Sequence, residues 1–149
     1  MLPIPPLAEG LRLEFLIAGA VHSMNDGGVH EKTVPHTIIA VVTEGAYEVR
    51  CPGRRARMAV GEAFLTGANL PLHITHWNDP KSGSMRSEWI HFHFTLYGTI
   101  DFTSLLDLPL VLPPGPCKGF AQISRELREG QGAPGPASPR PGAAVTAIP

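Results

Sequence analysis

Three side chains capable of chemistry, Trp89, His91 and His93, occupy every second position within residues 87–96. Successive side chains of a β-strand point to opposite faces, so these three share one face. The other face is expected to join the core and carries Ile90, Phe92, Phe94 and Leu96. An indole and two imidazoles are costly to bury unless each polar nitrogen has a partner. The pattern therefore predicts a strand whose polar face lines a binding cavity or lies under other elements.

Metal binding is one chemistry that this spacing allows, because His91 and His93 would point the same way and could share one ion. A complete site would add His73, with His36 or His76 as a further ligand. For His91 two other interpretations stay open, a hydrogen-bonded structural histidine and a direct contact to a bound molecule. We expect the domain to have no cofactor. A bound divalent metal is the alternative.

Other routes to catalysis have little support in the sequence. It contains no Gly-x-Ser-x-Gly motif, no phosphate-binding loop and no cysteine with a neighbouring histidine. Paired carboxylates such as Glu44 and Glu48 fall at expected strand ends, where both are predicted to be surface charges. An enzyme is not the expected function.

Composition restricts the class of protein. The 149 residues suffice for one domain, and a formal net charge of −1 offers no electrostatic reason to expect direct contact with nucleic acid. Cys51 and Cys117 are far apart and form no Cys-x-x-Cys pair, so free thiols are expected. The proline-rich N-terminus fits neither a signal peptide nor a membrane span. We therefore expect a cytoplasmic protein that does not bind membranes.

The elements that must position the candidate residues are short strands separated by Gly and Pro turns. Apart from residues 87–96, strands are predicted at residues 11–20, 37–43, 46–51, 63–66 and 72–77. Residues 30–36 are read as an edge or loop approach, and the apolar run 37–43 as a strand buried on both faces. Arg54, Arg55 and Arg57 are expected to form a solvated hairpin face rather than a phosphate patch.

Beyond Gly98 the pattern changes to helical spacing. A short helix or helical turn is predicted at residues 101–108, a rigid proline connector at 113–116 and an amphipathic helix at 118–129. We place the domain at residues 1–129 and expect residues 130–149 to be a disordered Pro/Gly/Ala-rich tail. The predicted fold class is all-β, a small sandwich or jelly-roll barrel followed by one or two short C-terminal helices.

Several motifs, in this order, resemble the sensor half of AraC-type transcriptional regulators. They are Thr-Glu-Gly-Ala-Tyr at residues 43–47, Pro-Gly-Arg at 52–54, Ala-Val-Gly-Glu-Ala-Phe-Leu at 59–65, Leu-Pro-Leu-His at 70–73 and Trp-Ile-His-Phe at 89–92. The resemblance extends over about residues 11–129. It implies a cupin barrel that binds a small effector, often a sugar, and a C-terminal helix that dimerises.

The chain departs from that family in one respect, because no helix-turn-helix pattern follows Gly130. The resemblance therefore implies regulation by a ligand and dimerisation, with DNA contacted only through a helix-turn-helix domain that this chain does not carry. The chain also lacks the His-x-His of the first motif of metal-binding cupins, since residues 37–42 are apolar.

Our leading hypothesis is a sensing and dimerisation domain with a pocket inside the barrel. The side chains expected to face that pocket are His36, Tyr47, His73, Trp89, His91 and His93. Trp77 and Trp89 are first of all core or rim aromatics, and either could also stack on a sugar ring. The alternative hypothesis is a small metal-dependent cupin enzyme, an isomerase or dioxygenase, that uses His73, His91 and His93.

Overall fold

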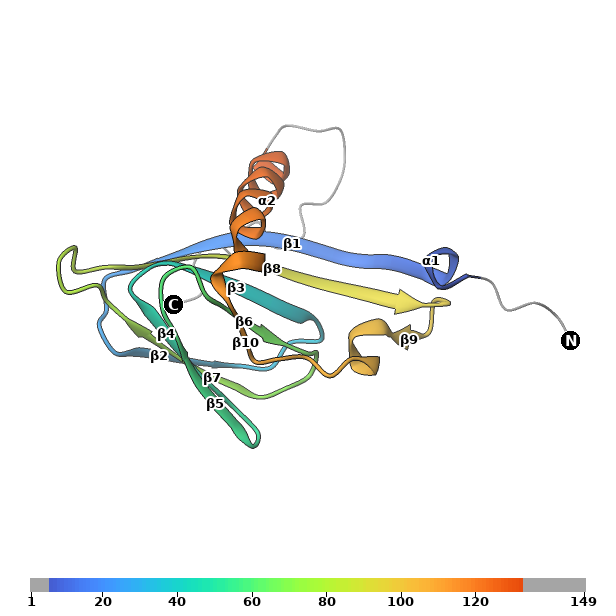
Figure 1. The fold of residues 1–149 in the computed structure, drawn as a ribbon, viewed down its shortest axis with the longest axis horizontal. Coiled ribbons are helices and arrows are strands. Elements are labelled where there is room, and N and C mark those ends of the chain that lie inside the picture. Colours follow the sequence, from blue (N-terminus) through green and yellow to red (C-terminus); the bar gives the residue numbers. More distant parts are fainter. Residues whose placement is uncertain (1–5, 133–149) are drawn as a thin grey trace, which may run out of the picture.

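The computed structural model describes residues 6–132, which form two antiparallel β-sheets and a long helix on the outside (Figure 1). The first and last described elements are the helices α1 (Leu7–Gly10) and α2 (Pro114–Gly132). Between them the elements are β1 (Leu11–Ser23), β2 (Gly28–Lys32), β3 (Thr37–Glu44), β4 (Ala46–Cys51), β5 (Arg54–Met58), β6 (Ala63–Thr66), β7 (Leu72–Trp77), β8 (Met85–Leu96), β9 (Ile100–Asp101), the 3-10 helix η1 (Phe102–Leu105) and β10 (Val111–Leu112).

The strand order joins segments that are far apart in the chain. The larger sheet has the order β1-β8-β3-β6-β10, with β9 also paired to β8, and the smaller sheet has the order β2-β7-β4-β5. The longest pairing is that of β1 with β8, from Leu11 opposite Leu96 to Ser23 opposite Met85. Every sheet pairing in the described residues is antiparallel. The predicted fold class, an all-β jelly-roll barrel followed by a C-terminal helix, is confirmed, although the predicted short helix is the 19-residue α2.

Several local signals in the sequence predicted strand bounds correctly. The strands β4, β6 and β7 have the predicted bounds, and β3 is buried along most of its length on both faces. The hairpin between β4 and β5 turns at Pro52 and Gly53, where Gly53 has a φ of 72° that glycine adopts without steric cost. The arginines of this hairpin are exposed as predicted, and Arg55 pairs with Glu48 at 2.6 Å.

One prediction about element type is confirmed in part and another is wrong. The edge or loop approach predicted at residues 30–36 overlaps the edge strand β2, which begins at Gly28, ends at Lys32 and pairs with β7 alone. The predicted proline connector at residues 113–116 is wrong, because α2 already begins at Pro114. Proline is tolerated in the first turn of a helix, since the N–H groups there have no partner within the helix. The helical turn predicted at 101–108 is confirmed only as η1, capped by Asp101.

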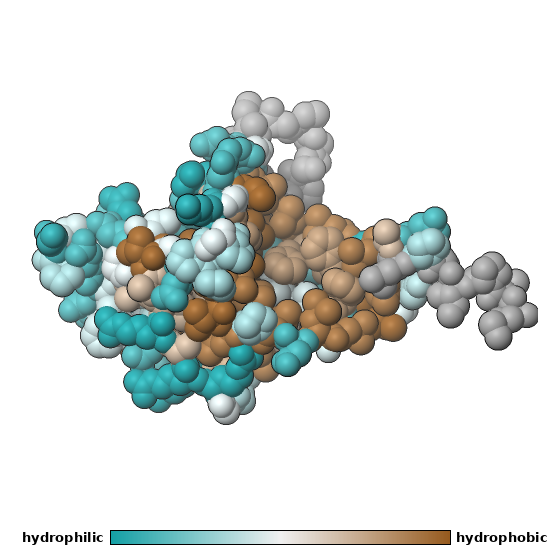
Figure 2. Space-filling view, in the orientation of Figure 1, coloured by the Kyte–Doolittle hydropathy of each residue, from teal (hydrophilic) through white to brown (hydrophobic). Residues whose placement is uncertain are grey.

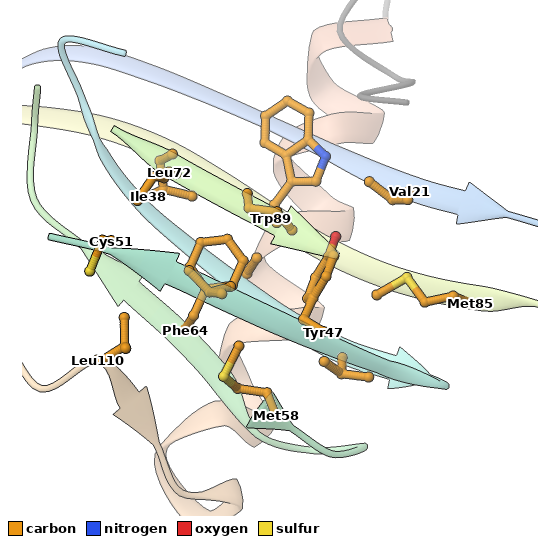
Figure 3. Close-up of a cluster of buried hydrophobic side chains, with 14 of the residues drawn as sticks. Val21, Ile38, Tyr47, Cys51, Met58, Phe64, Leu72, Met85, Trp89 and Leu110 are labelled. Atoms are coloured by element: carbon orange, nitrogen blue, oxygen red, sulfur yellow. The ribbon is translucent and has the colours of Figure 1, made fainter. Parts of the chain in front are cut away.

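The space between the sheets is filled mainly by apolar side chains from both layers (Figure 3). The close-up in Figure 3 includes Ile38, Tyr47, Phe64 and Trp89, all of which are buried. The prediction that the apolar face of β8 would be plain core is confirmed for Ile90 and Leu96, which are buried, but not for the whole face. That face lies on the outer side of the larger sheet, where α2 covers part of it and Phe92 and Phe94 remain half-exposed.

Two further expectations concern the cysteines and the C-terminal region. Both cysteines are free thiols, as predicted, and both are buried. The helix α2 continues three residues beyond the predicted end at Glu129, and the rest of the predicted tail, residues 133–149, lies outside the described part of the chain. No helix within residues 6–132 is both long and apolar enough to cross a membrane.

Candidate functional site

The polar face of β8 points into the barrel, and the alternation of its residues correctly placed Trp89, His91 and His93 on that one face. Trp89 is 2% exposed and His91 is also buried, while His93 is half-buried nearer the end of the strand. The neighbouring strand β1 makes room for the indole at Gly19, which lies directly opposite Trp89. A Cβ atom at Gly19 would lie 2.1 Å from Cζ2 of Trp89, so only glycine fits at this position. The strand pairing therefore holds Trp89 in one place.

Aromatic and imidazole rings from both sheets meet in the interior. On the β8 side, the ring centroid of His91 lies 4.7 Å from Trp89 and 6.0 Å from His36, and His36 stacks on Phe15 at 4.0 Å. On the opposite side, His76 lies 5.2 Å from Tyr47. The same His76 lies 5.1 Å from His30 of β2, edge to face. Histidines from three strands and one loop thus face a common space.

Most of the predicted site residues lie in this interior. His36, Tyr47, Trp89, His91 and His93 face it, but the predicted interior position of His73 is wrong. His73 lies on the outer face of the smaller sheet, opposite Glu31 and Arg50 in the strand register, with Nε2 4.0 Å from Oε1 of Glu31. The reason is the period of two along β7, where Leu72, Ile74 and His76 take the inward positions.

The predicted pocket residues did not include three interior residues, His30, Lys32 and His76, of which His76 was named only as a possible metal ligand. Its inward position could have been predicted, because it shares a face with two apolar residues of a correctly predicted strand. His30 and Lys32 were missed because β2 was not predicted as a strand. Its apolar residue Val29 points outward and is 51% exposed, whereas its inward residues are polar. An edge strand with a polar inward face has no hydrophobic period to detect.

Burial holds the interior histidines in their neutral form. The pKa of His91 is lowered to about 3, first by burial and then by the charges of Lys32 and His36. The pKa of His30 is lowered to about 4, mainly by burial and then by His76. Burial also lowers the pKa of His36 and His76. Each neutral imidazole offers one N–H donor and one acceptor nitrogen.

Many of these nitrogen atoms have no hydrogen-bond partner. The unpartnered buried atoms in the interior are Nδ1 and Nε2 of His30, Nδ1 of His36, Nε2 of His76, Nε1 of Trp89, Nε2 of His91 and Nδ1 of His93. Nearly all buried polar atoms in native proteins are paired, with protein or with water. This concentration in one space therefore indicates a site for a polar molecule.

Tyr47 is an exception among the interior polar residues, because its hydroxyl pairs with Oγ of Ser87 at 2.5 Å. Burial raises the pKa of Tyr47, so the phenol stays protonated. Tyr47 therefore links β4 of the smaller sheet to β8 of the larger one and is a structural contact between the layers.

The interior is nearly closed in this structure. Its cavity has a volume of about 10 Å³ and is lined by residues of both sheets, His30, Lys32, Tyr47, Trp89 and His91 among them. One water molecule needs about 10 to 15 Å³. An open groove of about 570 Å³ lies beside it, at the end of the smaller sheet, and includes Lys32, Arg50, Leu72 and His73. Lys32 borders both spaces.

The histidines do not form a metal site in the described residues. Within residues 6–132, no group of three His, Cys, Asp or Glu side chains is arranged to hold a metal ion. The predicted set of His73, His91 and His93 is divided between the outer face and the interior. The donor set therefore does not fit a resident metal, and we derive no chemistry through one.

The helix α2 contacts the strands that carry the interior residues. Ser124, which is fully buried, donates from Oγ to the carbonyl oxygen of Trp89 at 3.1 Å. The side chain of Gln131 bonds both the N–H and the C=O of Ala18, at 3.0 and 3.1 Å, on the free edge of β1. Arg128 pairs with Glu88 at 2.9 Å. These contacts connect the helix to the backbone next to Trp89 and Gly19.

Solved structures of other proteins align with part of this chain. The structural neighbours are cupin-fold proteins. An ethanolamine utilization protein Q from Salmonella typhimurium aligns over 55% of this chain and 67% of its own, with 17% identity and a TM-score of 0.44. The cupin domain of Schizosaccharomyces pombe Cnp3 aligns over 55% and 62%, with 17% identity and a TM-score of 0.45. KdgF from Halomonas sp. aligns over 55% and 80%, with 21% identity and a TM-score of 0.43.

The similarity to these cupins is partial and concerns the fold alone. No protein-family model matches the chain, and no curated protein is significantly similar in sequence. The chemistry of this domain therefore has to be argued from its own residues.

Proposed function

We propose that this cupin-like domain binds a small polar molecule, a sugar or a related metabolite, between its two sheets, as the sensing and dimerisation part of a regulator similar to the AraC type. One observation carries the proposal, the set of unpartnered buried nitrogen atoms on His30, His36, His76, Trp89 and His91. A buried donor or acceptor without a partner costs about 1 to 3 kcal/mol. A ligand with hydroxyl groups would satisfy several of them together.

Binding in the interior requires the sheets to separate, because the present cavity holds no more than one water molecule. The strand that can move at least cost is β2, an edge strand that pairs with β7 alone. Occupied and empty states would then differ in the position of the interior side chains. The bonds from Ser124 and Gln131 to β8 and β1 offer a route from these side chains to α2.

Ligand binding is tested by thermal unfolding in the presence of sugars, sugar acids, amino acids and divalent metals, since a ligand that prefers the folded state raises the melting temperature. His91→Ala is expected to weaken binding of the stabilising compound by about 10- to 100-fold, because it removes a buried hydrogen-bonding group. His22→Ala, which changes an exposed histidine on β1, is the matched control. Equal affinity in the two variants would contradict an interior site. Stabilisation by metals alone would favour the metal-dependent enzyme.

The dimerisation part of the proposal is supported by the outer face of the larger sheet. Figure 2 shows a broad apolar surface over β1 and β8 beside α2. Leu13 on this surface is 49% exposed, and Leu16, Phe92 and Phe94 are half-exposed. Apolar surface of this kind on a protein in water commonly marks an interface.

Leu13→Lys is expected to lower the dimer association constant by about 100-fold, because a two-fold interface contains the substitution twice. Sedimentation equilibrium over a range of concentrations measures the constant. Ile123→Lys is the control on α2, where the residue is 50% exposed. If Ile123→Lys dissociates the dimer and Leu13→Lys does not, the interface lies on the helix.

A further inference from the structure

Lys32 is the residue that separates the closed interior from the open groove. It lies at the end of β2, next to His30 on the inward face, while Glu31 between them is exposed. Its side chain borders the interior cavity beside His91 and also lines the groove of about 570 Å³ beside Leu72. A group that enters from the groove therefore meets Lys32 before it meets the histidines.

The charge of Lys32 is not balanced by the protein. Within residues 6–132, the side chain of Lys32 forms no ion pair, while its backbone belongs to the pairing of β2 with β7. No carboxylate lines the interior cavity, and the single carboxylate of the groove, Glu31, is exposed with His73 4.0 Å away. Burial lowers the pKa of Lys32 to about 8. A half-buried ammonium group without a counter-charge is costly, and an anion from outside would remove that cost.

The groove adds a second cation and the right dimensions. Arg50 lines it, is exposed and has no ion pair among the described residues. Volumes of about 300 to 1,000 Å³ are typical of small-molecule sites. Apolar walls are supplied by Leu72, Pro52 and Pro71. Two cationic side chains, Lys32 and Arg50, thus lie beside the neutral imidazoles of the interior. This arrangement fits a molecule that has an anionic group at one end and hydroxyl groups along the rest.

We propose that the ligand of this domain is a small hydroxylated organic acid that enters through this groove and places its anionic oxygen atoms on Lys32. This inference rests on the proposed function, since it names the class of molecule that the sheets would bind. Lys32 provides the charge, and the neutral imidazoles of His30 and His91 bond hydroxyl groups of the ligand. A neutral sugar would leave the ammonium group of Lys32 without a counter-charge and is expected to bind less tightly.

Matched compounds that differ only in the head group test the proposal on the full chain. The acids are gluconate, galactonate and glycerate, the neutral partners are glucose, galactose and glycerol, and the phosphates are glucose 6-phosphate, galactose 1-phosphate and glycerol 3-phosphate. Thermal unfolding at constant ionic strength ranks them, and calorimetric titration gives the dissociation constants. At least one anionic compound is expected to bind at least about tenfold more tightly than its neutral partner. Preference for a carboxylate or for a phosphate identifies the head group.

Lys32→Met is expected to weaken binding of that anion by about 10- to 100-fold, and Lys32→Arg to retain most of it. Lys81→Met, at an exposed loop lysine, is the matched control. The melting temperature of Lys32→Met without ligand should not fall, since an unpaired charge is removed, so lost binding is not lost folding. Tighter binding of a neutral sugar, or unchanged affinity in Lys32→Met, overturns the acid ligand and leaves the proposed function intact. If no compound of any class binds, the proposed function fails, and this inference fails with it.

Discussion

Replacing Trp89 by alanine is expected to lower the free energy of unfolding by about 3 to 5 kcal/mol, the range for removing a large aromatic side chain from a core. The indole is 2% exposed, lies against Gly19 of β1 and is 4.7 Å from the ring of His91. No neighbour can fill the space, because the strand pairing on both sides of β8 holds β1 and β3 in place. Denaturant unfolding measured at several protein concentrations gives the value and separates it from effects of self-association.

Two further variants make this result specific to the site of Trp89. Trp77→Ala removes a half-buried tryptophan of the outer face, over which Arg57 lies at 5.5 Å, and is expected to cost about 1 to 2 kcal/mol. Trp89→Phe retains an aromatic ring at this position and is expected to fold. It is the variant to measure if Trp89→Ala does not fold. Equal losses from Trp77→Ala and Trp89→Ala would contradict the buried position of Trp89.

A double-mutant cycle tests the contact between Trp89 and Gly19. Gly19→Ala alone is expected to be strongly destabilising, because its Cβ would overlap the indole. In the Trp89→Ala background the same change should cost at least about 1 kcal/mol less, since the overlapping atoms are gone. Additive effects would show that the two residues are not in contact.

Replacing Arg128 by methionine is the second change with a large expected effect, a loss of about 2 to 4 kcal/mol in the free energy of unfolding. Nη2 of Arg128 bonds both carboxylate oxygens of Glu88, at 2.9 and 3.0 Å. The side chain of Glu88 is 12% exposed and that of Arg128 is 34% exposed. The substitution leaves a buried carboxylate without its main partner, although Arg125 lies near enough to act on it.

The loss in Arg128→Met is expected to shrink as the pH falls from 7.5 to 5. Burial raises the pKa of Glu88 in the folded protein, against the opposing effect of Arg128, and removing the guanidinium raises it further. A carboxyl group whose pKa is higher in the folded than in the unfolded chain binds more protons when folded. Its contribution to stability therefore falls as the pH rises from the pKa of the unfolded chain to the pKa of the folded chain, and it returns on acidification.

Matched variants identify the pair as the cause. Glu88→Gln combined with Arg128→Met should recover a substantial part of the loss, because no buried charge remains. Arg125→Met changes an exposed arginine on the same helix and is expected to cost less than about 0.5 kcal/mol. A loss in Arg128→Met that is independent of pH, and that Glu88→Gln does not relieve, would contradict the buried-pair interpretation.

Local patterns in the sequence predicted most strands and part of the site. The β-branched run at residues 37–43 and the turn at Pro52 and Gly53 depend on the backbone preferences of the residues themselves, so they are visible without tertiary context. The alternation in residues 87–96 likewise placed Trp89, His91 and His93 on one face, because the period of a strand is a property of its backbone.

Only the tertiary structure decided which face of β8 looks inward and what meets it there. An alternating strand has two covered faces when a second sheet lies on one side and a helix on the other, and its sequence does not say which cover lies where. Gly19 lies opposite Trp89, and His30 and Lys32 come close to His91, through strand pairings that join residues far apart in the chain. The sequence alone determined the fold class and the polar face of one strand. The composition of the site depends on which strands pair over long distances in the chain. The period of a single strand carries no information about that pairing.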